Sequence, residues 1–497
     1  MRDHPPGLPS APRALSRLLG IAALCAAVVA VACAQPEPPP SMVIVVIDTL
    51  RADHLGLYGY QAHPTSPNLD ARAASAAVFE RAFSTAPWTL PAFGTLFTGQ
   101  IPTRHSAGVF VHDIEKMLER ADPRELVEHS ARSFYRLDRE IPTLGGTLQA
   151  AGYSTAAIMN NAFLSPEFGL SRGFDTYDYD PELPDKDAAS ATDRALAWLQ
   201  AREQEGAREP FLLIVHYFDP HMPYAAPEPF LGRFAEPYAD ERFSVPVTDM
   251  PRLRYRIRDR VEGWQRYMAL EQALYDEEIA YTDNELERLL GALDERRFLD
   301  DGYLLVTADH GEEFHDHGWI EHGHSVYDEV IHVPLMVWGP DVRPGRYELP
   351  VSLTDVMPTL LEAAGVARPD DLYGDSLLQV LREGPADRTA SALRFDRPLL
   401  SEAILYGDEK KSLIRWPYKV LADIEDRAEL FYDLETDPEE LDGHKAEQLD
   451  HQSRDRMLTM LAELQAIIVD ASSQSSSEGA SLSEETLDRL RALGYIR

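Results

Sequence analysis

Three apolar runs along the chain end in the same way, and this repetition limits the fold more than any other feature. The runs "VIVVID", "FLLIVHYFD" and "YLLVTADH" each stop at Asp or at Asp followed by His. Their aliphatic and β-branched residues predict buried strands. Helical patterns lie between them, for example over residues 191–204 and 284–297. Strands that alternate with helices predict an α/β fold: a large, mostly parallel sheet with helices on both faces and a site beyond the carboxyl ends of its strands.

The domain organisation follows from changes in this pattern. We expect a catalytic domain over residues 42–394 and, where short strands and polar turns follow, a smaller antiparallel subdomain over residues 395–470. The low-complexity stretch "ASSQSSSEGAS" predicts a flexible segment within residues 471–497, followed by a terminal helix capped by Ser481 and Glu484. The charged segment 111–140 and the segment 225–275 are predicted to lie over the rim of the site.

The first 33 residues have the pattern of an export signal. Three arginines precede the apolar run "LLGIAALCAAVVAVA", which is shorter than the ~20 residues of a membrane-spanning helix. Cys33 ends this run and is followed by a Pro-rich tether over residues 34–41. The pattern favours a bacterial lipoprotein anchored to a membrane through lipidated Cys33, over an ordinary signal peptide or an uncleaved anchor. We therefore expect an extracytoplasmic location in the cell envelope, periplasmic or secreted if no lipid is attached.

Composition excludes some classes of ligand. The only two cysteines, Cys25 and Cys33, lie in the export segment, so the mature domain has neither a disulfide nor a thiolate metal site. The chain carries 83 acidic and 47 basic residues, a formal charge of -36, which argues against nucleic acid as a partner.

The strand ends supply metal ligands. Asp309 and His310 follow one predicted strand and Asp48 another, so two carboxylates and an imidazole meet at one edge of the sheet. This set suits Zn²⁺ or Mn²⁺ and is less natural for Ca²⁺, which prefers oxygen alone. A single strand-end Asp is commonly a turn or cap residue, but the combination predicts a metal site.

Two further clusters contain histidine. The stretch "HYFDPHMPY" holds His216, Asp219 and His221, and "HDHGWIEHGHSVYDE" holds His315, His317, His322 and His324. Dense histidine tracts are typical of metal or anion sites, whereas the alternative is a solvated loop. In the second stretch we expect His324 to belong to the site and the other three histidines to lie at its rim.

Thr89 is the candidate nucleophile. It lies in "APWTLPAFGTLFTG", where a strand is predicted to pass into a helix, so backbone N–H groups and the helix dipole would face an incoming anion. A metal-bound hydroxyl has a lowered pKa and becomes a nucleophilic alkoxide. The alternatives are that Thr89 only caps the helix, or that Ser84, Thr85 or Thr95 takes this role.

Taken together, these stretches resemble the sulfatase branch of the alkaline phosphatase superfamily from about residue 42 to the end. "VIVVIDTLRADHLGLYGY" resembles its first metal-binding segment, "STAPWTLPAFGTLFTGQIPTRHSAG" its nucleophile segment and "FDPHMPY" its central His segment. "TADHGEEFHDHG" resembles its second metal-binding segment, and "ELFYDLETDPEE" and "LRALGYI" its C-terminal markers.

The sequence departs from this family at the nucleophile. Sulfatases carry Cys or Ser, oxidised to formylglycine, and an Arg four residues later, whereas this chain has Thr89 and Phe93. Threonine cannot become formylglycine, because oxidation of its secondary alcohol gives a ketone. Thr49 replaces the second Asp of the usual pair, and His324 is assigned to the usual Lys position.

The phosphodiesterase, phosphatase and transferase branch of the superfamily uses a metal-bound Thr. By this resemblance, a first metal is bound by Asp48, Thr89, Asp309 and His310, and Asp219, His221 and His324 bind a second or hold the substrate anion. Thr89, His221 and His324 are then the catalytic residues, with one or two divalent metals as cofactor.

The resulting hypothesis is a metal-dependent hydrolase or transferase of extracytoplasmic phosphate or sulfate esters, with phosphate preferred. The substrate would be a small molecule, a lipid headgroup or a glycan ester. The alternatives are a sulfatase that works without formylglycine and a catalytically silent, anion-binding surface lipoprotein.

Overall fold

The computed structural model describes residues 38–109, 134–179, 187–238, 260, 263–385, 397–424 and 427–492. The predicted export segment, Cys33 and most of the 111–140 segment lie outside these residues. The chain divides into two units, Met1–Pro39 and Pro40–Arg497, and the fold described below is that of the second. In the described part of the chain, no helix is both long and apolar enough to span a membrane.

A nine-stranded mixed sheet forms the centre of the described residues, in the order β12-β2-β11-β8-β1-β7-β5-β6, with β13 pairing β2. Strands β8, β1, β7, β5 and β6 are parallel to one another, whereas β11 is antiparallel to both β8 and β2. The three predicted strands are β1 (Met42–Ile47), β7 (Phe211–Tyr217) and β8 (Tyr303–Ala308). The others are β2 (Ala77–Phe83), β5 (Ser154–Met159), β6 (Thr176–Tyr179), β11 (His332–Trp338), β12 (Gly345–Tyr347) and β13 (Val351–Ser352).

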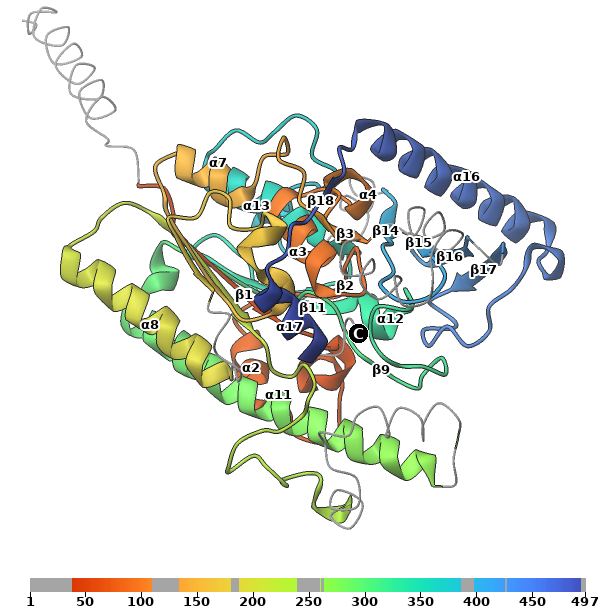
Figure 1. Cartoon of the computed structure of the whole chain (residues 1–497), viewed down its shortest axis with the longest axis horizontal. Coiled ribbons are helices and arrows are strands. Elements are labelled where there is room, and N and C mark those ends of the chain that lie inside the picture. Colours follow the sequence, from red (N-terminus) through yellow and green to blue (C-terminus); the bar gives the residue numbers. More distant parts are fainter. Residues whose placement is uncertain are drawn as a thin grey trace, which may run out of the picture. The chain divides into compact units, whose positions relative to one another are not determined.

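Helices cover both faces of this sheet (Figure 1). On one face α11 (Trp264–Glu295) packs against α8 (Ala188–Glu205) and α2 (Pro67–Ala73). On the other, α3 (Thr89–Thr98), α7 (Leu144–Ala150) and α13 (Val356–Ala363) pack together. The predicted α/β class with a mostly parallel sheet is confirmed.

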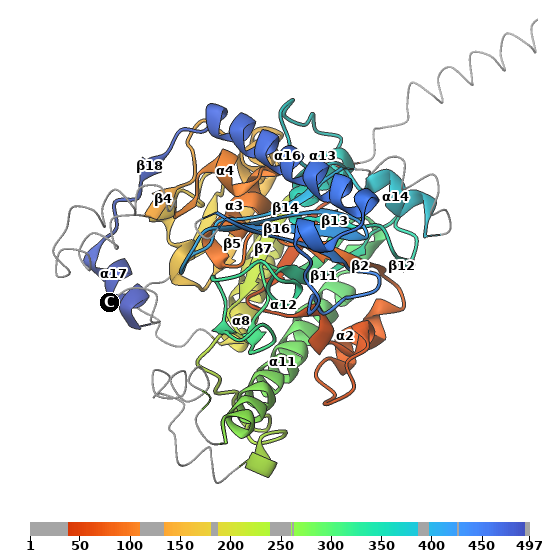
Figure 2. The ribbon, with the colours of Figure 1, turned by 90° about the vertical axis from the view of Figure 1, so that its right-hand side faces the viewer.

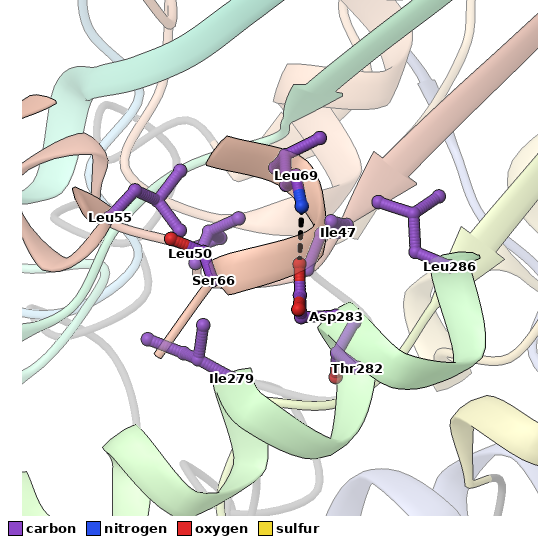
Figure 3. Close-up of a pocket in the computed structure, with 9 residues that line it drawn as sticks. All are labelled: Ile47, Leu50, Leu55, Ser66, Leu69, Ile279, Thr282, Asp283 and Leu286. Carbon is purple, nitrogen blue, oxygen red and sulfur yellow. Dashed lines mark hydrogen bonds between the residues drawn. The ribbon is translucent and has the colours of Figure 1, made fainter. Parts of the chain in front are cut away.

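Helix α11 also fixes the segment that follows β1. Asp283 on α11 accepts hydrogen bonds from the backbone N–H groups of Asn68 (3.0 Å) and Leu69 (2.8 Å) in the first turn of α2. A carboxylate at this position satisfies donors that a helix leaves unpaired at its N-terminus. A small hollow between α11 and this segment is lined mainly by apolar side chains, including Leu55 and Ile279 (Figure 3).

The C-terminal part forms a separate antiparallel sheet, as predicted. It contains β14 (Leu399–Ser401), β15 (Lys410–Arg415), β16 (Tyr418–Asp423) and β17 (Ala428–Asp433) in sequence order. Helix α16 (His451–Gln474) packs against β15 and β16 (Figure 2). The contact buries Met457 and Met460 of α16 together with Leu413 and Val420 of the sheet.

The segment after residue 470 differs from its prediction. Residues 471–474 complete α16, and β18 (Glu478–Gly479) pairs with β4 (Phe134–Arg136), so this polar stretch is held by backbone hydrogen bonds. The terminal helix α17 (Glu484–Ala492) is present, but Ser483, not Ser481, accepts the hydrogen bond from the Thr486 N–H. Two residues of the low-complexity stretch thus pair with the edge of β4, and the flexibility of the stretch stays a prediction.

Candidate functional site

Strand register brings Asp48 and Asp309 together. Ile47 of β1 pairs with Ala308 of β8, and both strands are parallel, so the next residue of each lies at the same edge of the sheet. The N–H of Asp48 continues the ladder to the carbonyl of Tyr217 on β7 (2.9 Å). Such an edge, beyond the carboxyl ends of parallel strands, is where α/β sheets place their sites.

His216 completes a compact acidic and imidazole cluster. One ligand atom each of Asp48, His216 and Asp309 lies within 4.8 Å of the others, and all three residues are buried. His216 pairs with Val46 in the β1–β7 register, two residues before Asp48, so its side chain and that of Asp48 lie on the same face. The distance from His216 Nε2 to Asp48 Oδ2 is 3.3 Å.

His310 joins this cluster through Nε2. Its Nδ1 donates to the carbonyl of Gly311 (2.9 Å), and its Nε2 lies 3.5 Å from both Asp48 Oδ1 and Asp309 Oδ2. Burial, followed by the neighbouring His322, lowers the pKa of His310 well below its usual range, so the ring is neutral. A neutral imidazole with its proton on Nδ1 presents the Nε2 lone pair to the carboxylates, as a metal ligand does.

The cluster fits a bound cation. Asp48 Oδ1, Asp309 Oδ2, Thr49 Oγ1 and both His216 ring nitrogens are buried and have no hydrogen-bond partner within the described residues. Burial, followed by the negative charge of Asp48, raises the pKa of Asp309 well above its usual range. Burial also opposes ionisation of Asp48, but interactions with His221, His216 and His310 outweigh it and lower the pKa of Asp48. Asp48, His216 and Asp309 each bring one ligand atom within 4.8 Å of the others, and oxygen and nitrogen donors grouped in this way suit Zn²⁺ or Mn²⁺.

Thr89 lies against this cluster as the first residue of α3. Trp88 is the N-cap, so Thr89 is not the cap, and its Oγ1 lies 3.4 Å from His310 Nε2. The competing hydroxyls are engaged elsewhere: Thr85 and Thr95 bond each other (2.6 Å), and Ser84 donates to the carbonyl of Ala86 (2.9 Å). Of the four hydroxyls that the sequence offered, Thr89 is therefore the one that contacts the cluster, with the first turn of α3 beside it.

Asn161 also contacts the nucleophile. It follows β5, and its Nδ2 donates to Asp48 Oδ2 (2.7 Å) and Thr89 Oγ1 (3.2 Å). Its Oδ1 accepts from the Phe163 N–H (2.9 Å), and the side chain is fully buried.

Three histidine rings form a row beside the cluster. The His322 ring centroid lies 4.5 Å from that of His310 and 5.1 Å from that of His221. His221 Nδ1 donates to the carbonyl of Met222 (2.7 Å), and both His221 and His322 are buried. The structure thus brings His221 to the site, as predicted from the sequence, together with a histidine that the prediction assigned to the rim.

A buried carboxyl group orients His322. Glu312 Oε1 lies 3.0 Å from His322 Nδ1, and Glu312 Oε2 accepts from the Tyr224 hydroxyl (3.0 Å). Burial raises the pKa of Glu312 to about 7, although the nearby His221 opposes this shift. The Glu312 contact therefore holds the His322 ring through its Nδ1.

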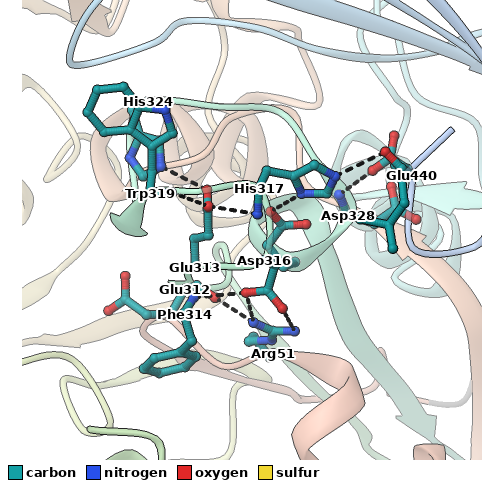
Figure 4. Close-up of polar contacts among 12 residues, drawn as sticks. Arg51, Glu312, Glu313, Phe314, Asp316, His317, Trp319, His324, Asp328 and Glu440 are labelled. Atoms are coloured by element: carbon teal, nitrogen blue, oxygen red, sulfur yellow. Dashed lines mark hydrogen bonds and ion pairs between the residues drawn. The ribbon is translucent and has the colours of Figure 1, made fainter. Parts of the chain in front are cut away.

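Two predicted ligands have other partners. Asp219 Oδ2 accepts from the Ala188 N–H at the start of α8 (2.6 Å), and burial raises its pKa to about 6. His324 Nε2 contacts Glu313 Oε2 (2.9 Å), and Glu313 also accepts from the N–H groups of His317 and Trp319 (Figure 4). Among the described residues, the ligand atoms that group within 4.8 Å are those of Asp48, His216 and Asp309. The second metal site of Asp219, His221 and His324 stays a prediction.

Sequence reasoning therefore missed three residues of the site. The sequence analysis groups His216 with Asp219 and His221 and gives it no role, although a histidine inside a buried strand already indicates a functional side chain. His322 was passed over for His324, two positions away. Asn161 gave no signal, since an amide after a strand is common in turns.

The sequence is similar to sulfatases along most of its length. A family model described as "Sulfatase" matches residues 40–366, and one described as "N-sulphoglucosamine sulphohydrolase, C-terminal" matches residues 315–467. The Δ4,5-hexuronate-2-O-sulfatase of Bacteroides thetaiotaomicron is 24% identical over 448 residues, covering 82% of this chain and 85% of that protein.

Solved structures share the fold. A 2-O GAG sulfatase superposes with a TM-score of 0.63 at 20% identity, covering 92% of this chain and 96% of the other. A phosphonate monoester hydrolase from Silicibacter pomeroyi gives 0.62 at 19% identity, covering 87% and 96%.

Proposed function

This chain belongs to the sulfatase family and is an ester hydrolase of the alkaline phosphatase superfamily, and we propose that Thr89 is its nucleophile, activated by a divalent metal, with phosphate esters preferred. The observation that carries this proposal is the buried Thr89 hydroxyl, which lies 3.4 Å from His310 Nε2 in the stretch that resembles the family's nucleophile segment.

The first-metal ligands of this proposal are Asp48, Asp309, His310 and Thr89, to which we add His216. Their unpaired oxygen and nitrogen atoms support a single site for Zn²⁺ or Mn²⁺. A metal bound there would lower the pKa of the Thr89 hydroxyl and offset the negative charge of the carboxylates.

The reaction has two halves. In the first, Thr89 gives its hydroxyl proton to solvent and Oγ1 attacks the phosphorus, while the bond to the ester oxygen breaks and its electron pair leaves with that oxygen. In the second, water attacks the phosphorus of the Thr89 ester, the Oγ1–phosphorus bond breaks, the electron pair returns to Oγ1, and Oγ1 takes back a proton from solvent. The backbone N–H groups at the start of α3 support the anionic oxygens in both halves.

We assign the proton transfers to the histidine row, with His322 in place of His324. His322 or His221 gives a proton to the leaving oxygen in the first half and takes one from the attacking water in the second. The contact of His322 Nδ1 with Glu312, and of His221 Nδ1 with the carbonyl of Met222, orients both rings beside the cluster.

The preference for phosphate rests on the residues that replace the formylglycine system. Thr89 cannot be oxidised to the aldehyde, and Phe93 supplies no charge where the family carries Arg. A sulfatase that uses Thr89 directly is the second candidate, favoured by the sulfatase names of the relatives. A silent anion-binding protein is the third, and the full set of metal donors beside a hydroxyl argues against it.

We further propose that the substrate is an extracytoplasmic small molecule, lipid headgroup or glycan ester. The pattern of residues 1–33 supports export, and lipidation of Cys33 would attach the enzyme to a membrane.

The test uses the purified full-length chain, loaded with Zn²⁺ or Mn²⁺. Turnover is measured on 4-nitrophenyl phosphate, bis(4-nitrophenyl) phosphate and 4-nitrophenyl sulfate, with Thr89→Ala as the control. We expect phosphoester turnover that Thr89→Ala abolishes while the variant keeps the wild-type Tm. Cleavage of the sulfate alone would refute the phosphate preference, and full activity of Thr89→Ala would refute the nucleophile.

A further inference from the structure

Asn161 is the one side-chain amide in the described site that bonds both the nucleophile and a metal ligand. Its Nδ2 lies 3.2 Å from Thr89 Oγ1 and 2.7 Å from Asp48 Oδ2. The residue lies at the end of β5, next to the carboxyl end of β7, and is the N-cap of a short 3₁₀ turn over Ala162–Leu164.

The orientation of the amide is determined by its backbone contact. Asn161 Oδ1 accepts from the Phe163 N–H, which can only donate, so the NH₂ group must face Thr89 and Asp48. A flipped amide would place two donors against each other at Phe163 and an acceptor against the Asp48 carboxylate. The two amide protons therefore point at Oγ1 and Oδ2.

We propose that Asn161 is a catalytic residue that stabilises the negative charge on Thr89 Oγ1. This inference rests on the proposed role of Thr89 as nucleophile. A hydrogen bond from a neutral donor favours the ionised form of its acceptor, and the effect is larger in a buried site than in water. Both Asn161 and Thr89 are buried, so this bond lies in surroundings less polar than bulk water.

The donor acts at two moments of the reaction. Before attack, it stabilises Oγ1 as the hydroxyl proton leaves to solvent. When Oγ1 bonds to phosphorus its charge falls, and the contact matters less. When water forms its bond to phosphorus, the Oγ1–phosphorus bond breaks, the electron pair returns to Oγ1, and the donor again faces an oxygen that gains charge.

The second proton of the amide orients a metal ligand. By satisfying Asp48 Oδ2, Asn161 leaves Oδ1, which is buried and without a hydrogen-bond partner in the described residues, as the oxygen for a cation. One rigid side chain thus sets the position of the nucleophile relative to this carboxylate. No charge is added to a cluster that already holds Asp48 and Asp309.

Two substitutions separate this role from the structural one. In Asn161→Ser, a neutral hydroxyl preserves the cap of the 3₁₀ turn but is too short to reach Oγ1. In Asn161→Asp, the cap is also kept, and the donor is replaced by an acceptor. Ser165→Ala is the matched control, because Ser165 caps the following turn through the Glu167 N–H and has no contact with Thr89.

The readouts are kcat and KM on 4-nitrophenyl phosphate, bound metal, Tm and the Kd of orthovanadate, which mimics the phosphoryl group in the transition state of transfer. For Asn161→Ser we expect kcat to fall about 10²- to 10³-fold, the effect typical of losing one such donor, with KM, metal content and Tm near wild type. Vanadate should bind at least tenfold more weakly. Asn161→Asp should lose more activity, and Ser165→Ala should match wild type.

These outcomes are distinguishable from failure of the proposed function. Turnover by wild type with kcat of Asn161→Ser within threefold of it would overturn the role of Asn161 and leave the nucleophile in place. Loss explained entirely by lost metal would also overturn it. If no ester is turned over, vanadate binding can still be measured. Weaker binding in both Thr89→Ala and Asn161→Ser than in wild type would support the contact. Equal binding by Asn161→Ser and wild type, or no binding to either protein, would refute it.

Discussion

Replacing His322 by Gln should abolish most activity, whereas the same change at His324 should leave most of it. The two histidines are two residues apart on one loop, and each contacts a buried glutamate: His322 contacts Glu312 at 3.0 Å and His324 contacts Glu313 at 2.9 Å. Only His322 is adjacent to the His310 ring in the contacts of the described residues, with centroids 4.5 Å apart.

His322→Gln and His324→Gln should lower the free energy of unfolding by similar amounts. Each removes one hydrogen bond to a buried carboxyl group, and His324→Gln also removes the long contact of His324 Nδ1 with the His322 carbonyl (3.3 Å). The Gln amide retains a donor of similar reach, so we expect each change to cost about 1 kcal/mol of unfolding free energy. Their effects on rate should differ. Loss of a general acid or base typically costs about 10²- to 10⁴-fold in kcat, and we expect this range for His322→Gln and less than about tenfold for His324→Gln.

The assay measures kcat, KM and Tm of both variants and of wild type on 4-nitrophenyl phosphate and on an ester with a much more basic leaving group. If His322 protonates the leaving oxygen, its loss should slow the second substrate more than the first, because a good leaving group needs no proton. Equal rates for the two variants, or a larger defect in His324→Gln at matched Tm, would refute the assignment and return the role to His324.

Three further outcomes follow from the geometry. Thr89→Ser should retain activity within about tenfold of wild type, because it keeps Oγ, whereas Thr89→Ala should lose at least about 10³-fold, measured as kcat at equal metal content. Affinity for Zn²⁺ should rise with pH, because the raised pKa of Asp309 means that binding displaces a proton; a Kd independent of pH by calorimetry would contradict this. The third outcome concerns stability: the hydrogen bond and charge of Glu329 outweigh burial and raise the pKa of His317 from 6.5 to about 9. The stabilisation from protonated His317 is then complete below about pH 6.5 and lost as the pH rises through about 9. The fall in Tm between pH 6 and pH 10 should therefore be smaller in His317→Gln than in wild type.

The central sheet, and the meeting of Asp48 with Asp309 at its edge, could be predicted because they depend on regular strands. In a parallel pair, the register that joins Ile47 to Ala308 also joins the residues that follow, so strand ends in the sequence become neighbours in space. The hydroxyl of Thr89 follows from the same regularity, because a helix that begins at the edge of the sheet points its first residue at that edge.

The choice between His322 and His324 could not be made from spacing. Glu321 and Gly323, on either side of His322, have positive φ angles of 72° and 85°, so the backbone turns twice within three residues. Alternation of side chains between faces applies to extended strands and does not survive such turns. The loop is then held from outside: the Gly323 carbonyl accepts from the N–H groups of Leu405 and Tyr406, far along the chain.

A second constraint on this loop also comes from distant residues. Arg51, after β1, donates to the Glu312 carbonyl (3.1 Å) and pairs with Asp316 (2.9 Å), while the carbonyl of Glu440, in the C-terminal part, accepts from His317 (3.1 Å) (Figure 4). Contacts of this kind join residues more than 100 positions apart. No local pattern in the loop predicts them, and they determine which of its histidines enters the site.

Thr89 and Phe93, the two residues that differ from the sulfatase pattern at the proposed nucleophile, are compatible with each other in the folded site. Phe93, in the position of the Arg that supports formylglycine, is fully buried, and its ring centroid lies 5.3 Å from that of His216. A hydrocarbon ring there cannot stabilise a charged or hydrated nucleophile, but it packs edge-on against His216, which we propose as a metal ligand. The polar support for Thr89 comes from Asn161 instead, through a bond to Oγ1. An Arg at position 93 would set a buried cation beside His216 and compete for the carboxylates that a metal needs, so Thr89 and Phe93 form one consistent set.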